Sequence, residues 1–169
     1  MPGGCPRVRS VRVALGGAYA PGEARVKERY DPAMDPRSRD AFLASFLRCR
    51  ASAGFLEDFY RRFVGSSEEI RMKFASTDMK RQVRMLEDSL YVIAVAVQGE
   101  EGSLARGDLP RIAARHSQKD LDIRPGLYDL WLECLIEAVR VHDPQCSGEV
   151  EAAWRETLAF GLDYMRARY

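Results

Sequence analysis

Hydrophobic residues recur at intervals of three or four along this chain from about residue 38 onward, which is the spacing of one face of an α-helix. These apolar stripes cover residues 42–47, 55–63, 79–97, 109–116, 127–141 and 150–165. No stretch alternates polar and apolar residues long enough to form a sheet, and no segment repeats at a fixed period. The pattern predicts an all-α chain of six to eight helices.

Residues typical of helix starts precede several of the stripes. Asp78 and Ser147 are expected to cap the helices that follow them, because a short polar side chain can accept a hydrogen bond from a free backbone N–H. Ser66 and Glu69 resemble a capping box that opens a short helix. The sequence QGEEGS, with two glycines, is expected to end the helix that Asp78 begins.

His116 ends an apolar stripe and is the most informative residue of the chain. The stripe consists of Leu109, Ile112 and Ala113. Asp108 is expected to begin this helix, with Pro110 in its first turn. A histidine on an inward-facing stripe is either a hydrogen-bonded core residue, which is the commoner case, or a metal ligand through a neutral nitrogen.

The first 36 residues contain early prolines and glycines and show no sustained periodicity. We predict that residues 1–36 are a flexible basic N-terminal extension and that residues 37–169 are one domain. Arg12 interrupts the short apolar stretch near the start, so a signal peptide is not expected. Residues 1–30 contain six basic and two acidic residues, and the remaining 20 basic and 23 acidic residues leave the domain slightly negative. This charge does not favour nucleic-acid binding.

The four cysteines contain no CxxC pair, and their spacing fits neither a zinc site nor a disulfide framework. No uninterrupted apolar run is long enough to span a membrane. The cysteine pattern favours a reducing compartment, and a cytoplasmic location is therefore expected.

Three segments read in order, FLEDFYRRFVGSSEEIRMKF, ASTDMKRQVRMLEDSL and RIAARHSQKDLDIRPGLY, resemble a bacterial single-domain globin, related to the globin domain of flavohaemoglobins. The resemblance covers residues 38–169. The matching positions are Tyr60, Phe74, Gln82, Leu86, His116 and Trp154. Phe74 and His116 are 42 residues apart, which is similar to the family's separation of its haem-wedging phenylalanine from its iron-binding histidine. The resemblance implies a globin fold, a three-over-three helical sandwich around haem b.

The resemblance also implies a role for each matching residue. His116 would be the proximal ligand of the haem iron, because a neutral imidazole donates a nitrogen lone pair. Tyr60 and Gln82 would donate hydrogen bonds to dioxygen at ferrous iron, which predicts tight binding and slow release. Leu86 would shape and dry the pocket, and Phe74 would pack against the porphyrin. Taken singly, the two aromatic residues are ordinary core residues and Gln82 faces solvent; the ordered set favours haem.

Tyr128 follows His116 by 12 residues, and by the same resemblance it sits behind the proximal imidazole or is a helix-packing tyrosine. An acidic residue partners this tyrosine in flavohaemoglobins, and LDYMRARY offers no match for it, which weighs against peroxidase-like activation. Ile123 is expected to form a further wall of the pocket, together with Leu56 and Met85. His142, in the last turn of its helix, is expected to be structural.

The leading hypothesis is a haem globin that binds dioxygen reversibly, and NO or CO at the same site. One alternative is a nitric oxide dioxygenase; it would need an external reductase, because the chain lacks a GxGxxG motif and the length for a reductase module. Another is a gas-sensing or haem-free signalling globin that acts through a partner. A monomer or homodimer is expected, with no nucleic-acid or membrane partner.

Overall fold

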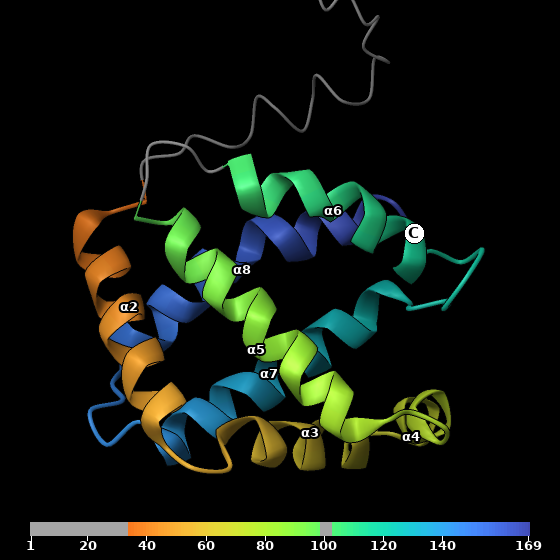
Figure 1. Ribbon diagram of the computed structural model, residues 1–169, viewed down its shortest axis with the longest axis horizontal. Helices are drawn as coiled ribbons and strands as arrows, with labels where there is room; N and C mark the ends of the chain where they lie inside the picture. The colour runs from red at the N-terminus through yellow and green to blue at the C-terminus, as the bar shows by residue number, and fades with distance from the viewer. Residues whose placement is uncertain (1–33, 99–102) are drawn as a thin grey trace, which may run out of the picture. The chain divides into compact units, whose positions relative to one another are not determined.

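The structure is a computed structural model of the 169-residue chain, and it describes residues 34–98 and 103–169, with only the backbone for residues 103–108. These residues form seven helices and no strand (Figure 1). The helices are α2 (Pro36–Ala51), α3 (Phe55–Gly65), α4 (Glu68–Phe74), α5 (Met79–Ala96), α6 (Ser103–His116), α7 (Pro125–His142) and α8 (Gly148–Arg166). The all-α prediction is confirmed for this part of the chain. None of the helices described is long and apolar enough to cross a membrane.

Two of the predicted helix caps are confirmed, and a third is shifted by one residue. Asp78 accepts a hydrogen bond from the N–H of Arg81 at 3.1 Å, and Ser147 caps α8 in the same way. Helix α4, however, is capped by Ser67, not by Ser66. The backbone of Ser66 is still helical, so it ends α3, whereas Ser67 is extended and its hydroxyl faces the free N–H groups of α4.

Helix α6 begins at Ser103, so the predicted start at Asp108 is wrong, and Pro110 lies inside the helix. A proline was expected only in the first turn, because it lacks an N–H and its ring crowds the preceding turn. The residues before it include the good helix formers Leu104, Ala105 and Arg106, but also Gly107 and Asp108, which favour a helix less. Packing of α6 against both α5 and α8 also favours the longer helix.

The centre of the core is Trp154 on α8, whose side chain is fully buried. Its ring meets the edge or face of Phe42 at 4.9 Å, Phe55 at 6.3 Å and Phe46 at 6.4 Å between centroids. The indole N–H donates to the hydroxyl of Ser45 at 2.9 Å. These contacts hold α8 beside α2, as Figure 1 shows, and the ring of Phe55 joins the start of α3 to Trp154.

The apolar face of α5 is less completely covered than the rest of the core. Only Leu90 and Ala94 of this helix are buried. The other residues of its predicted inward stripe are packed against the core but remain partly exposed; they are Met79, Val83, Leu86, Ile93 and Val97. Helix α5 therefore presents apolar surface that the described residues only half cover.

The predicted inward stripe is wrong for Leu130, which is 37% exposed. It is also wrong for two further stripe residues, Leu47 and Val141, which are each 62% exposed. Each lies close in sequence to a fully buried position of its helix. Because successive residues of a helix are rotated by about 100°, both side chains fall beyond the edge of the buried face.

Asp143 at the end of α7 is 1% exposed and holds the α7–α8 corner against α2. Its carboxylate accepts two hydrogen bonds from the guanidinium of Arg48, at 2.5 and 2.8 Å, and one from the N–H of Gln145. Burial alone would raise the pKa of Asp143, but the hydrogen bonds from Arg48, Ser45 and Gln145 outweigh it and hold this pKa below its ordinary value.

The predicted extension, residues 1–36, falls almost entirely outside the described residues, which begin at Met34. Helix α2 begins at Pro36, with Asp35 as its cap. The division into an extension and a domain at residue 37 stays a prediction.

Replacing Arg48 with methionine should lower the free energy of unfolding by about 3–5 kcal/mol at neutral pH, because the buried Asp143 carboxylate would lose its partner. A lowered native pKa stabilises the fold above the unfolded-state pKa, and this contribution is lost as the pH falls through the native pKa. The unfolding free energies of the variant and the wild type, measured in urea by circular dichroism, should therefore converge at acidic pH.

The matched control is Arg50→Met, which breaks an exposed ion pair with Glu87. It should cost less than about 1 kcal/mol. A loss for Arg48→Met no larger than that of the control would contradict the prediction.

Candidate functional site

The structure brings together three of the predicted site residues, Tyr60, Phe74 and Gln82. Tyr60 lies in α3, is 4% exposed, and its ring is 6.0 Å from that of Phe74 at the end of α4. Its hydroxyl donates to the backbone carbonyl of Gln82 at a long 3.4 Å. Phe74 also packs edge to face on Phe63, 5.8 Å away. The short α4 and its cap at Ser67 place Phe74 next to the aromatic face of α3.

Burial keeps the phenol of Tyr60 neutral. It raises the pKa of Tyr60 to about 12, against a smaller opposing effect of hydrogen bonding with Gln82. Gln82 sits in the first turn of α5, where its N–H bonds to the carbonyl of the capping Asp78, and Leu86 lies one turn later. The side chains of Gln82 and Leu86 are both partly exposed. A neutral hydroxyl and an amide are thus both present as hydrogen-bond donors at the start of α5.

His116 is the last residue of α6 and is partly buried. Its Nδ1 is 2.8 Å from the backbone carbonyl of Ile112, one turn earlier. A carbonyl can only accept a hydrogen bond, so Nδ1 carries a proton, and in the neutral imidazole Nε2 keeps its lone pair. This hydrogen bond also fixes the orientation of the ring, as is typical of histidines that bind metals.

Tyr128 on α7 lies near His116, with the ring centroids 6.5 Å apart and the planes inclined by 35°. Burial raises the pKa of Tyr128 to about 12, while the positive charge of Arg166 acts in the opposite direction. Arg166 is itself paired with Asp129 and Asp163. The positive charge that lowers the pKa of Tyr128 thus comes from a guanidinium that two carboxylates already pair with.

Ile123 lies near His116 through the backbone: its N–H donates to the carbonyl of His116 at 3.0 Å. Its side chain is partly buried against the core, and the same is true of Phe74 and Leu86. A large apolar cofactor would fit these residues, because it would cover their remaining surface while Nε2 of His116 supplied a metal ligand.

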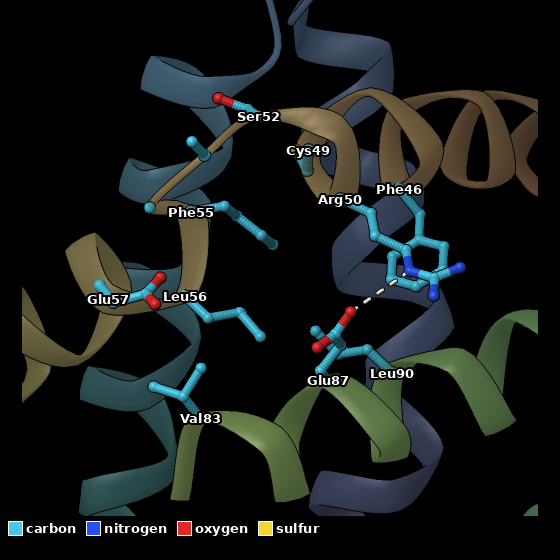
Figure 2. Close-up of a pocket in the computed structure, with 12 residues that line it drawn as sticks. Phe46, Cys49, Arg50, Ser52, Phe55, Leu56, Glu57, Val83, Glu87 and Leu90 are labelled. Carbon is cyan, nitrogen blue, oxygen red and sulfur yellow. Dashed lines mark hydrogen bonds and ion pairs between the residues drawn. The ribbon is translucent and has the colours of Figure 1, made fainter. Parts of the chain in front are cut away.

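A pocket of about 190 Å³ opens elsewhere, between the α2–α3 corner and α5 (Figure 2). Leu56 and Val83 point toward it, and the ion pair of Arg50 and Glu87 lies at its side. Of the predicted site residues and pocket walls, only Leu56 lines this pocket. Met85 is 51% exposed.

His142 contacts the α2–α3 region. Its Nδ1 is 2.8 Å from the hydroxyl of Ser52, and its Nε2 is 3.6 Å from the carboxylate of Asp58. Cys49, Cys134 and Cys146 are free thiols. Within the part of the chain that the structure describes, no three histidine, cysteine or acidic side chains gather as a metal site.

Lys73 has no distinguishing pattern in the sequence, yet it connects the end of α4, where Phe74 lies, with the loop that follows His116. Its ammonium group donates to the carbonyls of Leu121 and Asp122, in the loop that follows His116. Its position directly before Phe74 is the one signal that the sequence offers.

The structure was compared with known proteins. A crystal structure from Pseudomonas aeruginosa, described as structurally highly homologous to a human haemoglobin, is 41% identical and superimposes with a TM-score of 0.71. The match covers 78% of this chain and 98% of the Pseudomonas protein. No protein-family model and no curated protein matches the chain. Together with the all-helical architecture, this relative confirms the resemblance to bacterial single-domain globins: the chain belongs to the globin family and has the globin fold.

Proposed function

We propose that this globin binds haem b with His116 as the axial ligand of the iron, and that it binds dioxygen reversibly. NO and CO would use the same position. The hydrogen bond from His116 Nδ1 to the carbonyl of Ile112 is the observation that carries the proposal. Among the described residues, no interaction favours the nitric oxide dioxygenase or signalling alternatives.

His116 meets the requirements of an axial ligand. Donation to Ile112 selects the tautomer with a free lone pair on Nε2 and makes the imidazole a better electron donor. When bound, ferrous haem would supply an iron that binds diatomic gases. Tyr128 lies near the ring, with the two centroids 6.5 Å apart.

Tyr60 would stabilise the bound gas from the other side. Its phenol stays protonated at physiological pH, since its pKa is about 12. Its bond to the Gln82 carbonyl is long, so little is lost when the hydroxyl turns toward a ligand. Phe74 and Leu86 add apolar surface that excludes water and strengthens such a hydrogen bond.

Replacing His116 with alanine should abolish ligation of the iron and most haem affinity. The second histidine of the chain, His142, bonds to Ser52 and cannot take its place. The test is haem titration of the purified chain, followed by the Soret band of the reduced and CO-bound forms. His142→Ala is the matched control, since His142 bonds to Ser52 at the α2–α3 region, and it should bind haem like the wild type. A wild-type chain with no Soret band after reconstitution would falsify the proposal.

Replacing Tyr60 with phenylalanine should speed dioxygen release by about 10- to 100-fold, the loss expected for one hydrogen bond to a partly charged acceptor. Stopped-flow mixing of the oxygenated protein with dithionite or CO measures this rate. Tyr91→Phe, on an exposed tyrosine of α5, should leave it unchanged. Equal release rates in the Tyr60 variant and the wild type would assign the stabilising role to another group, such as Gln82.

A further inference from the structure

The loop after His116 contains the one non-glycine residue at positive φ in the described part of the chain. Asp122 has φ of 51°, in the left-handed region that L residues avoid. Aspartate is among the residues that tolerate this region best, but the conformation persists only where the surroundings hold it. The contacts of this loop therefore identify the residues that hold Asp122 in this conformation.

Backbone hydrogen bonds fold the loop back onto the last turn of α6. The N–H of Leu121 donates to the carbonyl of Arg115, and the N–H of Asp122 donates to that of Ser117. The N–H of Ile123 donates to the carbonyl of His116 itself, at 3.0 Å. These bonds satisfy carbonyls that the end of a helix leaves without a partner.

Lys73 holds the opposite side of the same peptide groups. Its ammonium group is 2.9 Å from the carbonyl oxygen of Leu121 and 2.7 Å from that of Asp122. The second oxygen shares a peptide plane with the N–H of Ile123, which bonds to the carbonyl of His116. One peptide group thus connects the Lys73 cation with the backbone of His116, and hydrogen bonds in such a chain strengthen one another.

The side chain of Asp122 provides two further attachments. One carboxylate oxygen accepts a hydrogen bond from the hydroxyl of Tyr169 at 2.7 Å, and the other is 3.9 Å from the ammonium of Lys73. Helix α4, the loop and the segment after α8 therefore meet at Asp122.

We propose that Lys73 and Asp122 are positioning residues for His116. Together they clamp α4, which ends in Phe74, onto the loop that closes α6, and so set the direction in which the imidazole points. The inference rests on the proposed haem function, and it adds a link between the phenylalanine and the histidine that would contact opposite parts of the cofactor.

The experiment compares Lys73→Met, which keeps an unbranched side chain of similar length but removes the ammonium, with Lys73→Arg, which can still donate to both carbonyls. Arg71→Met is the matched control, because Arg71 lies on the same helix and pairs with the exposed Glu68. In the ferrous haem-loaded protein, the iron–histidine stretching band in the resonance Raman spectrum should shift and broaden for Lys73→Met. Lys73→Arg should restore it, and Arg71→Met should leave it unchanged.

A second measurement uses the haem-free protein and is independent of the proposed function. Amide hydrogen exchange at Asp122 and Ile123 should be about 10- to 100-fold faster in Lys73→Met, the effect of losing roughly one charge-assisted hydrogen bond. Exchange at the fully buried Leu135 of α7 reports global unfolding, and it should accelerate by no more than the loop amides do, because the lost contact also lowers the stability of the whole fold.

Unchanged exchange at both loop amides in Lys73→Met would overturn the clamp. Faster loop exchange with an iron–histidine band identical to that of the wild type would overturn the positioning of His116. If the wild type itself takes up no haem, the proposed function fails, while the exchange measurement still decides whether Lys73 holds the loop.

Discussion

The arrangement of the helices depends on the buried indole of Trp154 and its one acceptor, the hydroxyl of Ser45. An indole N–H taken out of water without a partner would destabilise the fold by about 1–3 kcal/mol, so this tryptophan can be buried only where α2 presents that hydroxyl. Once α8 is placed against α2, the rings of Phe42 and Phe55 close around it. The ion pair of Arg48 with Asp143 then fixes the α7–α8 corner on the same side.

Among the residues that the structure describes, α2, α3, α7 and α8 enclose the core more completely than α5 does. The residues that are fully buried come chiefly from α2, α3, α7 and α8, whereas α5 contributes two buried residues and several partly exposed apolar ones. Helices with few buried contacts open more readily than the core does. Under the proposed function, haem would cover this surface, and a ligand that binds only the folded state stabilises it. The region of α5 and α6 is therefore where the stability of the fold and the binding of the cofactor are most closely coupled.

The sequence was sufficient for features that depend on neighbours along the chain. Apolar periodicity predicted the helices, and the caps at Asp78 and Ser147 followed from short polar side chains at their starts. Ser66 and Ser67 are chemically alike, so the choice between them depends on where α3 ends, which a local pattern does not specify. Pro110 marks a helix start by its own chemistry, but the packing of α6 against two helices overrides it.

Long-range pairing could not be predicted in the same way. The chain contains 26 basic and 25 acidic residues, and nothing in their spacing selects Arg48 as the partner of Asp143, 95 positions later. Family resemblance named Tyr60, Phe74 and His116, because their order and spacing are those of the family. It did not name Lys73 or Asp122, whose contact spans 49 positions and is made with a backbone carbonyl that any residue could supply.

Tyr60 and His116 are held in place by different kinds of contact. Under the proposed function, this difference would affect the hydrogen bond to a bound gas and the bond from the histidine to the iron differently. Tyr60 is part of the enclosed aromatic core, in contact with Phe59 at 4.7 Å and with Phe74, so its hydroxyl has few alternative positions. His116 ends a helix that packs on the less enclosed side, and its carbonyl is held by hydrogen bonds within a loop. Under the proposed function, a rigid donor at Tyr60 would keep the strength of its hydrogen bond to the gas constant, while changes around the loop alter the bond from His116. Lys73 connects the end of α4 with the loop at the end of α6. A movement of α4 would therefore reach His116 through this contact.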